Sequence, residues 1–118
     1  MFKENQEVIC VNNLEMESVL VVGEKYKVQQ YISLMNGDLV YLVDMKIQFI
    51  PRRFIEVGHP NQEKIIALYN EIRLLDQNIE EIFNIEHMTG VDHFWERENL
   101  RGQIDNLEET INELRNHK

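Results

Sequence analysis

The residues that could perform chemistry are concentrated in one stretch, NIEHMTGVDHFWEREN (residues 84–99). It contains His87, Asp92, His93 and Glu96, whose imidazole and carboxylate groups are common ligands of zinc. The spacing argues against a metal site, because His87 and His93 do not stand four positions apart as helical ligand pairs do, and no third histidine lies nearby. We therefore predict neither a metal site nor a catalytic site in this stretch.

The same stretch contains the residues needed to end one helix and begin another. Gly90 tolerates the left-handed backbone conformation that is common just after a helix end. Thr89 and Asp92 have the spacing of a capping box, or alternatively Asp92 alone caps the second helix. A protonated His87 is favourable near the end of the first helix, where the helix dipole is negative. We therefore interpret residues 88–92 as a bend.

The rest of the chain carries no recognisable catalytic motif. It has no glycine-rich phosphate loop and no nucleophile turn of the kind that accompanies a Ser/His/Asp triad. Cys10 lies in an apolar segment, which predicts a buried, inert thiol. The pair Arg52 and Arg53 could contact phosphate, although such a pair more often forms a solvated turn. We expect a protein that is not an enzyme and has no cofactor.

The net charge of −9 is unevenly distributed along the 118 residues. Residues 1–60 carry 6 basic and 8 acidic side chains, whereas residues 61–118 carry 6 basic and 13 acidic ones. Such an acidic surface repels nucleic acid and favours a partner protein with a basic surface. The longest purely apolar run, residues 19–22, is far too short to span a membrane, and no signal peptide is recognisable. We therefore expect a cytoplasmic protein.

Residues 1–60 have the composition and turn residues of short β-strands. The expected strands are residues 7–13, 24–33, 39–45 and 47–50, and residues 52–57 are expected to make one turn and a final short strand. The segment 39–45 is almost wholly apolar, which predicts a strand buried on both faces. Pro51 ends the fourth strand, because proline has no amide hydrogen to donate. Five short strands in so short a segment favour a small closed barrel.

The second expected strand and the turn after it have a specific pattern. Alternation places Tyr26, Val28 and Gln30 on one face of the strand. Asn36 and Gly37 then follow, and both residue types tolerate a positive φ. This pair predicts a type I′ hairpin between the second and third strands.

Two motifs, VxGxxYxV at residues 21–28 and PxRF at residues 51–54, occur in this half of the chain. With the order of the strands, they resemble small SH3-like barrel proteins that are common in phages and prophages of Gram-positive bacteria. The resemblance covers residues 7–57 and implies that residues 12–26 form the long first loop, and that PRRF forms a helical turn before the last strand. The aromatic residues do not cluster in the sequence, so we do not expect recognition of proline-rich peptides.

Residues 61–118 contain two apolar stripes with heptad spacing. The first stripe is Ile65, Leu68, Ile72, Leu75, Ile79 and Ile82, and the second is Leu100, Ile104, Leu107, Ile111 and Leu114. Folding the chain at Val91 brings them into register, with Ile82 opposite Leu100 and Leu68 opposite Leu114. The predicted fold is therefore α+β: a small SH3-like β-barrel (residues 1–60) followed by a long antiparallel, coiled-coil-like α-helical hairpin (residues 61–118).

The first arm carries more apolar residues than one partner helix can cover. The residues outside the stripe are Ile66, Tyr69, Leu74, Phe83 and Ile85. We expect them to pack on the barrel, on a second copy or on a foreign partner. Phe94 and Trp95 are expected to close the open end of the hairpin over Ile82, Phe83 and Met88.

The leading hypothesis is a phage-type inhibitor that occupies the surface of a host nucleic-acid-handling or defence protein. Phe83, Phe94 and Trp95 are the predicted apolar anchors, because aromatic residues dominate binding hot spots. The predicted electrostatic steering residues are Glu80, Glu96, Glu98, Glu108 and Glu109. A simpler interpretation of these glutamates is a solvated helix face.

Two other hypotheses are a self-associating scaffold that dimerises through the hairpin, and a barrel that binds nucleic acid. The basic residues available to such a barrel are Lys25, Lys27, Lys46, Arg52 and Arg53.

Overall fold

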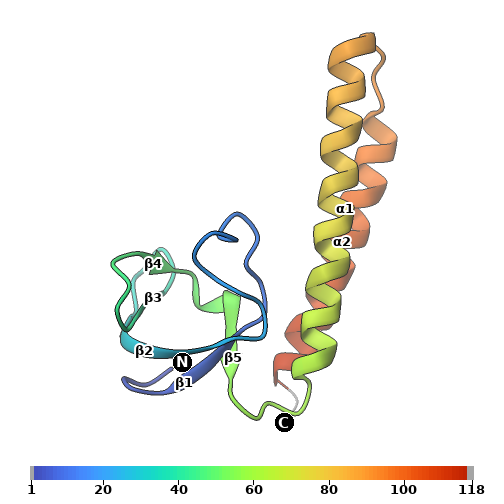
Figure 1. Cartoon of the computed structure of the whole chain (residues 1–118). Coiled ribbons are helices and arrows are strands. Elements are labelled where there is room, and N and C mark those ends of the chain that lie inside the picture. The colour runs from blue at the N-terminus through green and yellow to red at the C-terminus, as the bar shows by residue number, and fades with distance from the viewer. Residues whose placement is uncertain (1, 117–118) are drawn as a thin grey trace. The chain divides into compact units, whose positions relative to one another are not determined.

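The computed structural model describes residues 2–116, and the chain divides after Gln62 into two compact units (Figure 1). Within the described residues, the first unit contains a five-stranded antiparallel sheet and the second contains two long helices. This arrangement confirms the predicted α+β class. Neither helix in this part of the chain is long and apolar enough to cross a membrane.

The sheet consists of five short strands. They are β1 (Glu7–Cys10), β2 (Lys25–Ile32), β3 (Leu39–Leu42), β4 (Gln48–Phe49) and β5 (Phe54–Glu56). Their order across the sheet is β4-β3-β2-β1-β5, so the last strand returns to pair with the first. A single 3₁₀ turn, η1 (Pro51–Arg53), precedes β5, where the sequence predicts a helical turn. β4 and β5 are the two edges of the sheet, which strand pairing does not close within the described residues.

The core of the sheet unit is formed by side chains from all five strands and from the loop before β2. Its buried members are Val8, Cys10, Leu20, Val28, Val40, Leu42, Phe49 and Phe54. Phe54 makes edge-to-face contacts with Phe49 and Tyr26, at centroid distances of 5.9 and 6.2 Å. Because Phe54 directly follows η1, these ring contacts anchor the turn and the start of β5 to the core. Cys10 is buried, as the sequence predicts.

A β-bulge in β2 changes which of its side chains face the core. Val28 pairs with Leu42, but Gln30 pairs with Tyr41, so β2 has one extra residue between these two pairs. Beyond the bulge the alternation is displaced by one position: Tyr31 packs against the core, and Gln30 is exposed. The prediction that Gln30 shares a face with Val28 is therefore wrong, because simple alternation allows no extra residue.

The connection between β2 and β3 is not the predicted type I′ hairpin. Ile32 pairs with Leu39, so the loop is longer than the two residues of that turn. Gly37 has a φ of +124°, but Asn36 does not have a positive φ, which a type I′ turn requires at both central positions. The N–H of Gly37 donates instead to the carbonyl oxygen of Leu34 at 3.2 Å.

β3 is shorter than predicted and buries one face only. Val40 and Leu42 are buried, whereas Leu39 and Tyr41 are partly exposed. The prediction of a strand buried on both faces is therefore wrong. The apolar residues after Leu42 belong to a turn, in which Asp44 has a φ of +66°, and this conformation ends the strand.

The second unit is an antiparallel helical hairpin. α1 (Gln62–Thr89) and α2 (Phe94–Asn116) lie side by side, and residues 90–93 connect them (Figure 1). Gly90 has a φ of +71°, and its N–H donates to the carbonyl oxygen of Glu86 at 2.8 Å. A glycine in this conformation ends α1 without the steric cost that a Cβ brings. The connection overlaps the predicted bend at residues 88–92, and the two-helix hairpin is confirmed.

The two predicted stripes are the protected faces of the helices. Their fully buried members are Ile65, Ile72, Ile79 and Ile111, and the other members are half-buried. Polar contacts across the hairpin agree with the predicted register. Arg115 Nη2 donates to the hydroxyl of Tyr69 at 3.1 Å, and Glu86 pairs with Arg97. In the sequence, the midpoint of each pair lies within one residue of Val91, the position at which the chain is predicted to fold back on itself.

Candidate protein-binding surface

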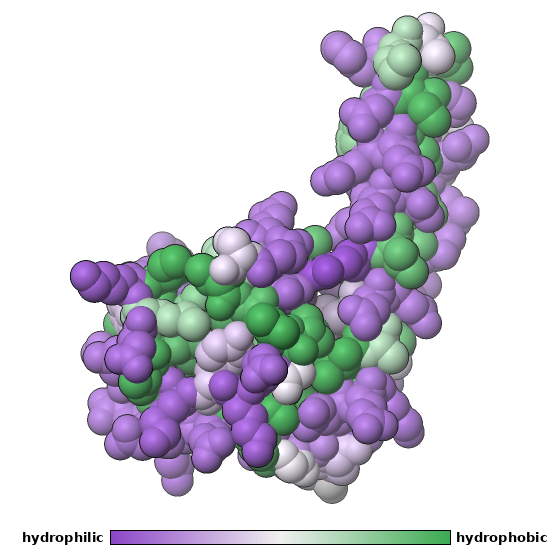
Figure 2. Space-filling model, viewed as in Figure 1, coloured by the Kyte–Doolittle hydropathy of each residue, from purple (hydrophilic) through white to green (hydrophobic). Residues whose placement is uncertain are grey.

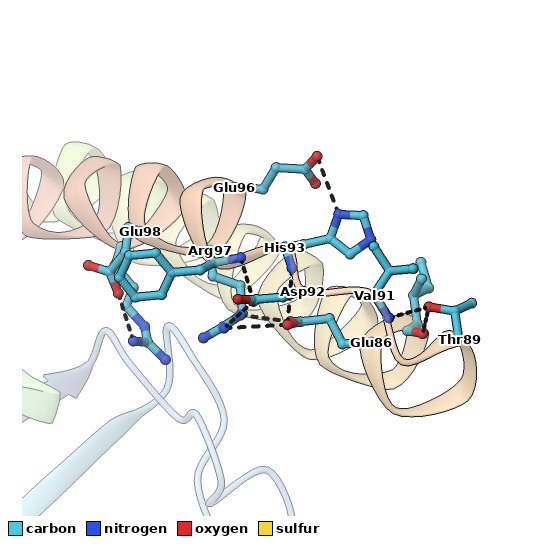
Figure 3. A network of polar contacts seen from close by, with 11 residues as sticks. Glu86, Thr89, Val91, Asp92, His93, Glu96, Arg97 and Glu98 are labelled. Atoms are coloured by element: carbon cyan, nitrogen blue, oxygen red, sulfur yellow. Dashed lines mark hydrogen bonds and ion pairs between the residues drawn. The ribbon is translucent and has the colours of Figure 1, made fainter.

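An ion-pair network, here called the clasp (Glu86, Asp92 and Arg97), joins the two helices next to the bend (Figure 3). Arg97 Nε on α2 lies 2.7 Å from Glu86 Oε1 on α1. Arg97 Nη2 lies 3.4 Å from Asp92 Oδ1 in the connection. The backbone N–H of His93 donates to Glu86 Oε2 at 3.1 Å. One arginine therefore ties together α1, the connection and α2 through charge-assisted contacts.

The guanidinium of Arg97 also covers two aromatic rings. It lies 4.6 Å from the centroid of Phe83 on α1 and 5.7 Å from that of Phe94 on α2. Both distances are within the range of cation–π attraction. Phe83 and Phe94 nevertheless remain 45% and 44% exposed. The clasp therefore holds the two rings in place and leaves about half of each accessible.

Trp95 lies in the first turn of α2 and is 82% exposed. Its ring packs edge-to-face against Phe94, with centroids 5.4 Å apart. Figure 2 shows apolar surface among hydrophilic side chains at this end of the hairpin. Phe94 and Trp95 are predicted to close the hairpin over Ile82, Phe83 and Met88. This prediction is wrong for Met88, which is 84% exposed, and the side chain over the Phe83 ring is that of Arg97. We call Phe83, Phe94 and Trp95 the aromatic end.

The polar residues of the bend have structural partners. Thr89 Oγ1 donates to the carbonyl oxygen of Ile85 at 2.7 Å and accepts the N–H of Val91 at 3.3 Å. Asp92 Oδ1 accepts the N–H of Phe94 at 2.9 Å. Of the two predicted alternatives, the capping box is therefore wrong, and Asp92 satisfies the first turn of α2 by itself.

The histidines of the bend do not gather carboxylates around them. His93 Nδ1 lies 3.6 Å from Glu96 Oε1, one turn further along α2. His87 is exposed in the last turn of α1. Within residues 2–116, no group of three or more His, Cys, Asp or Glu side chains is placed to hold a metal ion.

The predicted glutamates occupy exposed helix positions, but only some lie near the aromatic end. The five residues are Glu80, Glu96, Glu98, Glu108 and Glu109. Glu96 and Glu98 share the first turns of α2 with Trp95, and Glu98 pairs with Arg101 at 3.2 Å. Glu80 lies one turn before Phe83 on α1. Glu108 and Glu109 lie about 20 Å further along α2, at 1.5 Å per residue, and are not part of the same surface.

Sequence reasoning missed Arg97, which is the centre of the clasp. The signal was present, because Glu86 and Arg97 stand at mirror positions about the same bend that relates the isoleucine and leucine stripes. Opposite charges at mirror positions of an antiparallel hairpin predict a cross-helix ion pair. Tyr69 and Arg115 also stand at mirror positions about the bend, and the Arg115 guanidinium lies 5.9 Å from the Tyr69 ring centroid.

The two neighbouring arginines of the sheet unit have different surroundings. Arg53 Nη1 donates to the carbonyl oxygen of Leu14 at 2.8 Å and to that of Asn12 at 3.3 Å, so it holds the first loop. Arg52 lines a separate groove on the surface of the unit. Arg53 is therefore engaged by the first loop of the sheet unit, whereas Arg52 lies beside the groove.

The groove beside Arg52 has a volume of about 640 Å³ and is also lined by Tyr31, Leu34 and Ile50. The hydroxyl of Tyr31 donates to the carboxylate of Asp38 within it. Burial, together with this hydrogen bond and the negative charge of Asp38, raises the pKa of Tyr31 to about 12. The Tyr31 hydroxyl therefore stays protonated at neutral pH and donates a hydrogen bond to Asp38, which stabilises the β2–β3 loop.

Comparison of the chain with protein-family models, with curated proteins and with solved structures gave no match.

Proposed function

We propose that this chain is a non-enzymatic protein-binding module that presents the aromatic end of its hairpin to a partner protein. The observation that carries the proposal is the 82% exposure of Trp95 beside a clasp that fixes the surrounding rings. Aromatic side chains dominate binding hot spots, and a ring on an already rigid element loses little conformational freedom on binding. An exposed indole adds little to the packing of the hairpin itself, so we assign it to a partner.

The partner has an apolar pocket with basic residues around it. Residues 61–118 carry 13 acidic against 6 basic side chains, and Arg97 is already engaged by the clasp. Glu80, Glu96 and Glu98 flank the aromatic end and complement a basic rim. Glu108 and Glu109 extend the negative field along α2. In this proposal the rings supply most of the affinity, and the glutamates accelerate the encounter.

The version of this function that we favour is a cytoplasmic phage-type inhibitor of a host nucleic-acid-handling or defence protein. Support comes from the resemblance of residues 7–57 to SH3-like phage proteins. The strand order and the η1 turn before β5 are compatible with a small SH3-like barrel. An acidic hairpin competes directly for the basic surface with which such a host protein contacts nucleic acid.

Affinity capture with matched variants tests the role of the aromatic end. The purified full chain, Trp95→Ala and Met35→Ala are each immobilised and exposed to a lysate of a Gram-positive bacterium. Met35 is a fully exposed apolar side chain of the sheet unit and serves as the control. We expect the wild type and Met35→Ala to retain the same protein, and Trp95→Ala to bind it at least about tenfold more weakly. Retention of no protein, or equal retention by Trp95→Ala, contradicts the proposal.

The electrostatic part of the proposal has its own test with the captured protein. Reversing Glu80, Glu96 and Glu98 to lysine is expected to slow association and to flatten its dependence on salt. The corresponding triple glutamine variant removes the charges without reversing them, so its association rate should lie between those of the wild type and the lysine variant. Unchanged association by the lysine variant shows that these glutamates form only a solvated face.

A further inference from the structure

A groove of about 440 Å³ opens between α1 and α2 in the middle of the hairpin. We call it the amide groove, and it is lined by Glu71, Leu74, Leu75, Gln103, Asn106, Leu107 and Thr110. Leu74 is 60% exposed, although it stands next to a residue of the apolar stripe. Glu71 is the one charged residue among those that line it in the described chain. This face therefore combines accessible apolar surface with a low density of charge.

The side of α2 that faces the groove differs in composition from the rest of the helix. Asn99, Gln103, Asn106 and Thr110 follow one another at spacings of three or four residues and form one stripe. No member of this stripe is charged, although α2 carries 6 acidic and 3 basic residues in total. Two acidic hairpins repel one another wherever their charged faces meet. The uncharged stripe is the surface along which a second acidic hairpin can approach.

Gly102 provides an independent indication of close approach. It lies in the interior of α2, where glycine is destabilising relative to alanine. A Cβ built at Gly102 meets no atom of residues 2–116 within 4 Å, so packing within this part of the chain does not require a glycine there. The residue adjoins Gln103 in the sequence and precedes Asn106 by one turn, and both of these neighbours line the amide groove. A missing side chain at this position allows the backbone of another helix to come close.

We propose that the amide groove is where the hairpin packs against the hairpin of a second copy of this chain. Amide side chains both donate and accept hydrogen bonds, so Gln103 and Asn106 are complementary to themselves across a two-fold axis. A basic foreign partner has little to bind here, because the groove offers only Glu71. This surface is separate from the aromatic end, and the inference does not rest on the proposed function.

The size of the hairpin face is compatible with a stable dimer. The 23 residues of α2 extend about 35 Å, and two helices side by side are about 20 Å wide. The whole face of the hairpin, of which the amide groove is the central part, therefore offers about 700 Å² to a second copy, close to the roughly 800 Å² per partner that stable interfaces bury.

Sedimentation of the full chain from about 1 to about 200 µM measures this association. We expect a concentration-dependent monomer–dimer equilibrium. Asn106→Glu places added negative charges near the two-fold axis and should weaken the dimer at least about tenfold. Asn112→Glu makes the same substitution at an exposed position of α2 outside the groove and should change the dimer constant less than about twofold. A monomer throughout the range, or equal effects of both variants, overturns the proposal.

Gly102→Ala tests the close approach through two readouts of opposite sign. At concentrations where the chain is monomeric, alanine should raise the midpoint of thermal unfolding, because it favours the helix. In the same variant the dimer should weaken at least about tenfold, because the new methyl group separates the two backbones. A stabilised monomer with an unchanged or stronger dimer overturns the proposed role of Gly102.

Discussion

Arg97 Nε and Glu86 Oε1 meet at 2.7 Å across the hairpin, and their side chains are only 14% and 15% exposed. This degree of shielding distinguishes the pair from a surface salt bridge, which contributes little because water screens it. Removing one member of a shielded pair leaves the other charge without its partner and away from water. The pair joins the two helices beside the bend, so we expect it to stabilise the aromatic end.

Glu86→Gln should lower the free energy of unfolding of the hairpin by about 2 kcal/mol. The expected loss lies below that of a fully buried pair, because Arg97 retains Asp92 at 3.4 Å. Urea unfolding followed by the helical circular dichroism signal measures it. Glu98→Gln is the matched control, because it removes one glutamate from an exposed ion pair with Arg101. The control should cost less than about 0.5 kcal/mol, and equal costs for the two variants would show that shielding is unimportant here.

Substituting alanine for Gly90 and for Gly102 should change the free energy of unfolding in opposite directions. At neither position does an added Cβ have an atom of the described residues within 4 Å, so we expect the difference to arise from backbone conformation. Gly90 has a φ of +71°, and alanine there should cost about 1 kcal/mol. Gly102 is helical, and alanine there should add about 1 kcal/mol to the stability of the monomer. Thermal and urea unfolding of dilute samples compare the two variants, and changes of the same sign are inconsistent with this explanation.

Ile79 and Leu74 both lie on α1. Substituting each with alanine distinguishes the contribution of the apolar stripe to stability from that of the amide groove. Ile79 is buried in the stripe, so Ile79→Ala should cost about 2–4 kcal/mol through lost burial and the cavity left behind. Leu74 is mostly exposed, so Leu74→Ala should cost less than about 0.5 kcal/mol in the monomer. Urea unfolding at low protein concentration gives both values. A large loss for Leu74→Ala would mean that the groove residues already have a packing role within one chain.

The hairpin was predictable because its two stripes are redundant signals. Ile65, Ile72 and Ile79 in one stripe and Ile111 in the other share the same heptad spacing, and the register then follows from folding the chain at Val91. The clasp is also present in the sequence, because Glu86 and Arg97 stand at mirror positions, but charged residues on such acidic helices are equally compatible with a solvated face. The exposure of Trp95 was not predictable, because a tryptophan beside a bend serves equally well as a cover for the apolar stripe.

The sheet was less predictable, because single residues decide its details. One extra residue between Val28 and Gln30 transfers Tyr31 to the core side. The Asn36-Gly37 pair has a strong local preference for a two-residue turn, but the pairing of Ile32 with Leu39 overrides it. Long-range strand pairing sets these features, and the local pattern of residue types does not contain that information.

Tyr31 should lose its proton only at strongly alkaline pH, because its pKa is raised to about 12. The folded state holds the proton more tightly than the unfolded state, whose tyrosine pKa is about 10. The resulting stability is therefore fully present below about pH 10 and is lost as the pH rises towards about 12. The difference in tyrosinate absorbance between the wild type and Tyr31→Phe should show this late transition, whereas Tyr41→Phe should leave it in place. In urea unfolding, the advantage of the wild type over Tyr31→Phe should shrink across the same interval. A difference curve centred near pH 10 would mean that Asp38 and burial do not hold the phenol proton.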